Sequence, residues 1–166
     1  MADRREAILN QILVLLRATG EFVTVDRNTL KITDEMCPAV VLFDGDEVNA
    51  NDRPDADSWS PPGRPQFMTM RPDICLRIMN KSVDVGTELN RLRAAIYHAI
   101  VMDKTLHDLV GTNGRMIMDA SRTQLAAGRK MTGDTTISFA FTYPLLVRDL
   151  VITGSAAPVI GPVDLS

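Results

Sequence analysis

The densest group of potential metal ligands lies in the acidic segment Asp44–Pro65. Carboxylate and amide oxygens are the ligands that calcium and magnesium prefer. Counted from Asp44, however, the fifth position of the calcium pattern D-x-[DN]-x-[DN]-G is Val48, and counted from Asn49 the sixth is Pro54. A solvated acidic loop is therefore the favoured interpretation, and a two-carboxylate magnesium site in a small metal enzyme is the alternative. The oxygen-bearing residues are Asp44, Asp46, Glu47, Asn49, Asn51, Asp52, Asp55 and Asp57.

No nucleophile or acid–base pair stands out elsewhere. The only histidines, His98 and His107, lie in no motif, and His98 falls off the apolar face of its expected helix. Cys75 alternates with apolar residues of an expected strand, so we expect a core thiol there rather than a nucleophile. The sequence has no G-x-S-x-G elbow and neither glycine-rich phosphate loop, G-x-x-x-x-G-K-[ST] or G-x-G-x-x-G. We expect no enzyme activity, no catalytic residue, no cofactor and no bound metal.

Basic residues gather late in the chain, where Asp119 alone opposes them: Arg115, Arg122, Arg129 and Lys130. Two interpretations stay open, a solvated hairpin and a contact with phosphates or an acidic partner surface. The net charge of −3 and the isoelectric point of about 5.3 argue against a protein whose whole surface binds nucleic acid.

The length of 166 residues favours one domain, and 45% hydrophobic with 23% charged residues is typical of globular proteins. The first apolar stretch, Ile8–Leu16, is interrupted by Asn10 and Gln11 and is too short to span a bilayer. We expect a cytosolic product without membrane contact, in which Cys37 and Cys75 are free thiols.

Helical spacing of apolar residues predicts two amphipathic helices. The first covers Arg4–Arg17 with Asp3 as its cap, and the second lies within residues 83–103 with Thr87 as its cap. A short helical turn is expected over Thr105–Leu109.

Six strands are expected. Phe22–Val25 and Leu30–Thr33 should form a hairpin, and Ala39–Phe43 a central strand. The alternation over Ile74–Met79 predicts another strand, which is bulged at Pro72 or begins after it.

The last two strands, Arg115–Thr123 and Thr135–Leu145, should form an antiparallel hairpin with its turn in AAGRKMTGD. Phe139 and Phe141 should lie buried against the two helices. The alternating residues of this face are Ile137, Phe139, Phe141 and Tyr143.

These elements predict an α+β fold, a mostly antiparallel sheet with two amphipathic helices packed on one face. The other face carries Thr, Ser, Ala and Met rather than charges, and it is either solvated or meets another subunit. We expect residues 1–150 to form the single domain, with Asp44–Pro65 as a projecting loop. Residues 151–166 are expected to form an extended apolar C-terminal tail that carries one charge, at Asp164.

Over about residues 2–147, the order of elements resembles the tail terminator proteins of long-tailed bacteriophages, also called minor tail or tail completion proteins. The resemblance rests on RREAILNQILVLLRATG, VVLFDGDE, PDICLRIMN, ELNRLRAAIYHAIVMD, GRMIMDASRTQ and TISFAFTYPL. The acidic segment Asp44–Pro65 is longer than the simplest members need.

The resemblance implies a structural virion protein at the head-proximal end of the tail, assembled in the host cytoplasm. In that family an α+β subunit forms a homohexameric ring. The ring caps the tail tube protein, stops tail polymerisation and presents a surface to the head connector or neck protein. Double-stranded DNA passes through the lumen without specific binding, and there are no catalytic residues to carry over.

Charge and hydrophobicity mark the residues expected at interfaces: Asp46, Glu47, Trp59, Arg64, Arg115, Arg122, Arg129, Lys130, Val159 and Ile160. Another neck or tail-completion protein of the same particle is the nearest alternative function. The small carboxylate-metal enzyme is the more distant one.

Overall fold

The computed structural model describes residues 3–50, 66–80, 84–126 and 131–145. These residues form five strands, three α-helices and one 3₁₀ turn. The elements are α1 (Arg4–Ala18), β1 (Thr24–Arg27), η1 (Asp34–Met36), β2 (Ala39–Asn49), β3 (Gln66–Asn80), α2 (Val85–Val101), α3 (Lys104–Val110), β4 (Arg115–Ala126) and β5 (Met131–Leu145). Among the described residues, no helix is long and apolar enough to cross a membrane.

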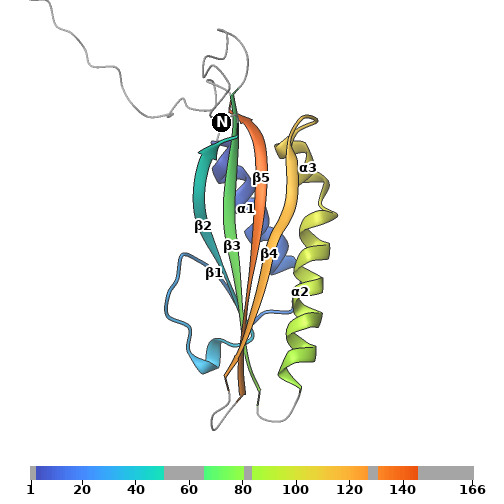
Figure 1. Cartoon of the computed structure of the whole chain (residues 1–166). Helices are drawn as coiled ribbons and strands as arrows, with labels where there is room; N and C mark the ends of the chain where they lie inside the picture. Colours follow the sequence, from blue (N-terminus) through green and yellow to red (C-terminus); the bar gives the residue numbers. More distant parts are fainter. Residues whose placement is uncertain (1–2, 51–65, 81–83, 127–130, 146–166) are drawn as a thin grey trace, which may run out of the picture.

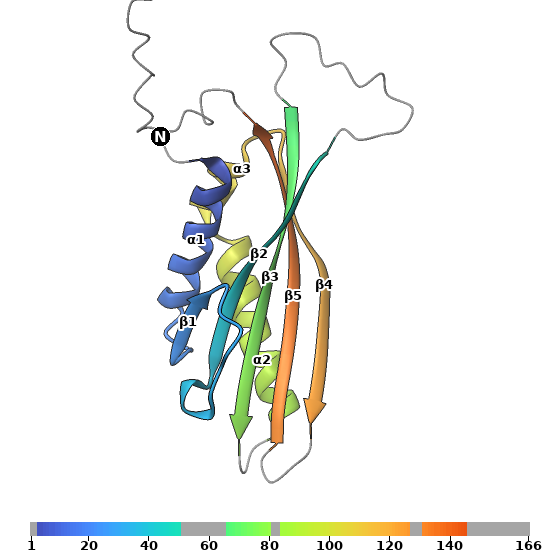
Figure 2. The same ribbon diagram turned by 90° about the vertical axis from the view of Figure 1, so that its left-hand side faces the viewer.

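The strands form one twisted sheet in the order β1-β2-β3-β5-β4, and the helices lie against one of its faces (Figures 1 and 2). Every pair is antiparallel except β1 with β2. The expected α+β class with a mostly antiparallel sheet is confirmed. Both expected helices are present, and the expected turn over Thr105–Leu109 is the short helix α3. We call the side of the sheet opposite the helices the open face.

The core lies between the sheet and the helices. The predicted apolar face of β5 is fully buried, and Phe139 and Phe141 stack with ring centroids 6.0 Å apart. They belong to the same buried cluster as Ile12 and Leu16 of α1 and Ile96 of α2. The prediction that this aromatic face packs on the helices is confirmed.

Acidic side chains cap all three helices. Asp3 accepts a hydrogen bond from the backbone N–H of Arg5, as expected. The expected cap Thr87 is wrong, because Asp84 accepts from the N–H of both Gly86 and Thr87 and begins α2 three residues earlier.

The predicted hairpin over Phe22–Thr33 is wrong. β1 pairs in parallel with β2, and residues 30–33 form no strand. Asn28 takes a positive φ of 55°, and its N–H donates to the carbonyl of Leu42, so the chain turns away from β1 instead of returning along it. Leu30 is 90% exposed as a result.

The acidic segment does not begin as a loop. β2 continues through Asp44 to Asn49, and residues 51–65 lie outside the described part. The strand accommodates an extra residue at Gly45 (φ +65°), where a Cβ would lie 1.7 Å from the Arg71 carbonyl oxygen. Only glycine fits this bulge without a shift of β3.

The same bulge explains how Pro72 fits inside β3. The bulged residues of β2 lie opposite Pro72, between the pairs Phe43–Asp73 and Asp46–Arg71. A proline lacks the N–H that a regular ladder needs, and a bulge is one of the places where it is tolerated. The predicted irregularity therefore lies at Pro72, but the extra residue belongs to the partner strand β2, and β3 begins earlier than expected, at Gln66.

The final hairpin is longer than predicted. β4 continues to Ala126 and β5 begins at Met131, while its connecting residues 127–130 lie outside the described part. A second bulge lies at Asp119, which has no partner on β5, between the pairs Met118–Phe139 and Ala120–Ser138.

Candidate assembly surfaces

The open face carries a groove of about 600 Å³. Alternation along β5 places Thr136, Ser138 and Thr142 on this face, and Thr142 bonds to Thr69 of β3 across a distance of 2.9 Å. Residues Thr29, Leu30 and Ile32, which follow β1, line one wall of the groove.

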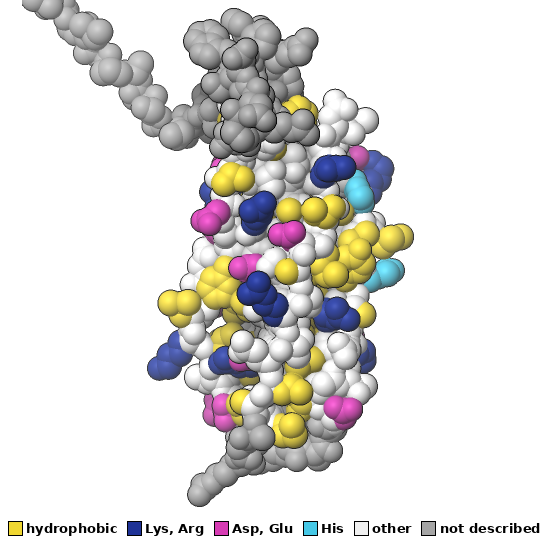
Figure 3. Space-filling model, viewed as in Figure 1, with side chains coloured by type: hydrophobic (Ala, Val, Ile, Leu, Met, Phe, Trp, Pro, Cys, Tyr) yellow, Lys and Arg dark blue, Asp and Glu magenta, His cyan; other side chains and the backbone are white. Residues whose placement is uncertain are grey.

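Paired charges cross the groove. Arg77 of β3 donates to both carboxylate oxygens of Asp134 on β5, at 2.7 and 3.0 Å. Four residues away along both strands, Ser138 donates to Asp73. The expectation that this face lacks charges is wrong, and Figure 3 shows acidic and basic side chains dispersed over it.

Cys75 lies in this groove rather than in the core. It is half-buried, and its Sγ lies 3.6 Å from the Thr136 hydroxyl oxygen. Burial raises the pKa of its thiol above the ordinary value, which keeps the thiol protonated and weakens it as a nucleophile. The expectation of a core thiol is wrong, because the alternation of β3 places Cys75 on the face opposite its buried neighbours Ile74 and Leu76.

Strand β4 forms an outer margin of the sheet and is exposed along most of its length. Two of its apolar side chains, Ile117 and Leu125, are 52% and 54% exposed. Hydrophobic side chains gather along this part of the surface in Figure 3. A long strand with a free edge and exposed apolar residues is prone to pair with another chain.

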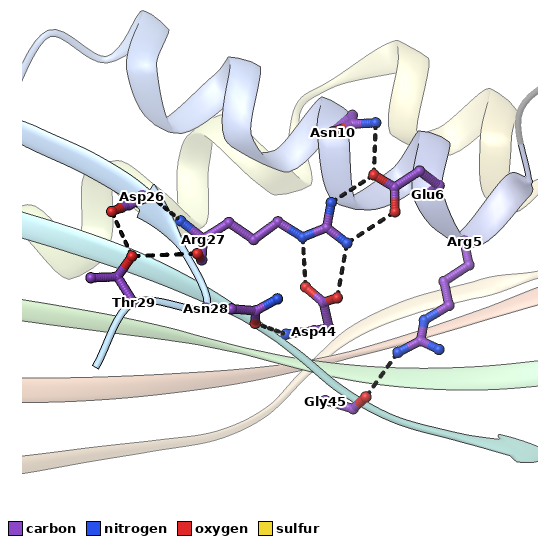
Figure 4. Close-up of polar contacts among 9 residues, drawn as sticks. All are labelled: Arg5, Glu6, Asn10, Asp26, Arg27, Asn28, Thr29, Asp44 and Gly45. Carbon is purple, nitrogen blue, oxygen red and sulfur yellow. Dashed lines mark hydrogen bonds and ion pairs between the residues drawn. The ribbon is translucent and has the colours of Figure 1, made fainter. Parts of the chain in front are cut away.

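A charged cluster joins α1 to the other margin (Figure 4). Arg27 of β1 lies between Glu6 of α1 and Asp44 of β2 and makes two hydrogen bonds to each carboxylate, at 2.6 to 2.9 Å. The guanidinium lowers the pKa of both carboxyl groups below their ordinary values. Nearby, Arg5 donates to the Gly45 carbonyl at 3.0 Å.

These contacts bear on the alternative of a magnesium site. Asp44 is occupied by Arg27, and Glu47 accepts a hydrogen bond from the Tyr143 hydroxyl. In the described part of the chain, no three His, Cys, Asp or Glu side chains are grouped so that they could hold a metal ion. Of the described carboxylates of the acidic segment, Asp44 and Glu47 therefore contribute to ion pairs and hydrogen bonds within the fold.

The predicted interface residues fall into separate places. Asp46 and Glu47 are neighbours on β2, but Glu47 faces the helices while Asp46 faces the groove side. Arg115 and Arg122 both lie on the open face of β4, opposite Thr142 and Thr136. The remaining candidates lie outside the described residues: Trp59, Arg64, Arg129, Lys130, Val159 and Ile160.

Sequence reasoning missed Ile117 and the Arg77–Asp134 pair. The alternation of β4 contains the signal for Ile117, whereas the pair spans 57 residues and becomes visible only with the strand register. A scan against protein-family models finds no match, and a search of curated proteins finds no significant relative.

Proposed function

We propose that this chain is a structural subunit of a bacteriophage tail that acts as the tail terminator. Its copies form a homo-oligomeric ring, most simply a hexamer, that caps the tail tube, stops polymerisation and presents the tail side of the head–tail joint. The proposal extends the resemblance in element order. The ring itself has no catalytic role.

One observation carries the proposal: the described sheet has helices on one face only and ends in the long exposed strand β4. A subunit that acts alone gains nothing from an unprotected edge, since such edges promote association. A cyclic assembly uses two different patches on each subunit and covers both when the ring closes. The open face and the edge of β4 are suitable patches.

The proposed partners follow from position in the tail. The ring contacts the tail tube protein on one side and the head connector or neck protein on the other. DNA passes through the lumen, and a subunit with a net charge of −3 suits passage without adhesion. Residues 151–166, which lie outside the described part, supply an apolar strip that could extend across a neighbouring subunit.

Tube-length assays test this function. Purified tail tubes that grow with the full chain present should stop at a defined length, and electron microscopy should show a ring at the tube end. A version that ends at Leu150 should cap less well if the tail contributes to the contact. Tubes of unchanged length, or a ring located in the neck away from the tube, would reject the terminator role. The second result would favour another neck or tail-completion protein.

A further inference from the structure

Both outer margins of the sheet contain strand edges that pair with no described strand, but the two edges differ in length. Strand β4 pairs only with β5 among the described strands, so its outer side is unpaired throughout the described residues. On the other margin, β1 covers β2 only from Ala39 to Leu42. No described strand pairs with the outer side of β2 between Asp46 and Val48, which we call the distal edge of β2.

The directions of these two margins suit each other. β2 and β4 run in opposite directions, because three antiparallel pairings separate them. In a ring whose axis runs along the strands, every copy keeps its strand direction. The β4 strand of one copy then meets the β2 strand of the next in antiparallel orientation, which allows regular backbone hydrogen bonds.

The side chains on the open face at the two margins also suit each other. On β2, Asp46 and Val48 lie on this face, because they pair with Arg71 and Thr69. On β4, Arg115 and Ile117 lie on the same face. Each margin therefore offers one exposed aliphatic side chain, and Val48 and Ile117 are 46% and 52% exposed.

Charge makes the contact directional. On the open face the distal edge of β2 carries Asp46, since Glu47 faces the helices, whereas the nearest part of β4 carries Arg115. Arg115 makes no ion pair with any residue in the described part of the chain. Antiparallel pairing of two β4 edges centred near Arg115 would place Arg115 near its own copy, whereas pairing of β4 with β2 places it near a carboxylate.

We propose that the outer edge of β4 binds the distal edge of β2 in a second copy of this chain, which joins the two sheets through antiparallel strand pairing. In the antiparallel register that places Asp46 opposite Ile117 and Val48 opposite Arg115, Val48 and Ile117 are diagonal neighbours, and so are Asp46 and Arg115, within reach of long side chains. The inference rests on the proposed ring but not on the ring's place in a phage tail.

Cross-linking of mixed single-cysteine chains tests the contact. Cys37→Ser and Cys75→Ser provide the background, which is first checked for an unchanged circular dichroism spectrum. Chains with Val48→Cys and Ile117→Cys are treated with a short bismaleimide, each alone and as a mixture. Covalent dimers should form only in the mixture. Val14→Cys, exposed on α1, replaces Val48→Cys as the control and should give no dimer with Ile117→Cys.

The outcomes separate this contact from the ring. Dimers from Ile117→Cys alone would show β4 pairing with itself and overturn the proposal. No dimer in the mixture, while light scattering shows an oligomer, would overturn the edge contact and leave the ring intact. No dimer and a monomeric mass, even with tail tubes present, would overturn both.

Charge reversal gives a second readout that needs no cysteine. Asp46→Arg and Arg115→Asp should each raise the concentration at half-assembly by at least about tenfold, because like charges then face each other. The double variant should recover most of this loss. Two independent losses that simply multiply would contradict a direct contact between the two residues.

Discussion

The two faces of the sheet come from the same strands but differ in what their side chains do. On the helix face, Phe139, Phe141 and Tyr143 are fully buried. On the open face of the same strand, Thr136 and Asp134 bond to polar groups of β3. The helix face supplies the burial that stabilises the fold, so the open face and its margins are free to carry contacts with other molecules.

The largest expected effect is on the helix face. Phe139→Ala should lower the free energy of unfolding by about 3–5 kcal/mol, because it opens a cavity among fully buried side chains. On the open face of the same strand, Thr136→Ala should cost less than about 1.5 kcal/mol. Urea denaturation of both variants measures the difference. Similar losses at the two positions would mean that the faces are not distinct in stability.

The bulge at the margin of β2 should show the next largest effect. Gly45→Ala should destabilise the fold by more than about 2 kcal/mol, because its Cβ meets the Arg71 carbonyl. Gly111 is the matched control, since it also has a positive φ but no atom lies within 4 Å of its would-be Cβ. Gly111→Ala should cost only about 1 kcal/mol. Equal melting temperatures for the two variants would argue against the bulge.

The charged cluster at the same margin predicts a pH dependence. Glu6 and Asp44 have lowered pKa values in the folded state, so their stabilising effect is complete above the ordinary values of 4.5 and 3.8. It is lost as the pH falls through the lower folded values. Arg27→Gln should therefore reduce stability near neutral pH and flatten the loss of stability in acid. Parallel stability curves for the two proteins would show that Arg27 does not set these pKa values.

The smallest effect on stability is expected at β4. Arg122→Ala should change the free energy of unfolding by less than about 0.5 kcal/mol, because the side chain is exposed and makes no ion pair with a described residue. If the open face is an assembly surface, the same variant should weaken association. A marked loss of stability would instead assign Arg122 a role within the fold.

Periodic patterns made the helices and the final hairpin predictable. The helical spacing of apolar residues in Arg4–Ala18 and the alternation in β5 each indicate directly which side chains are buried. The β1–β2 pairing was not predictable in this way, because a parallel pair is fixed by tertiary packing and by the turn at Asn28 rather than by a local pattern.

The candidate surfaces were harder to predict than the fold. Acidic composition suggested a loop at Asp44–Asn49, yet Gly45 lets a strand continue there by forming a bulge. Arg115 and Arg122 were identified from charge alone. Their common face could be known only from the register of β4, which the bulge at Asp119 shifts by one residue.

Native mass measurement of the full chain, alone and with purified tail tubes, tests the central claim most directly. The account predicts a closed assembly of about six subunits of 18.3 kDa, near 110 kDa, formed alone or once tubes are present. A chain that stays at 18.3 kDa under both conditions would contradict it.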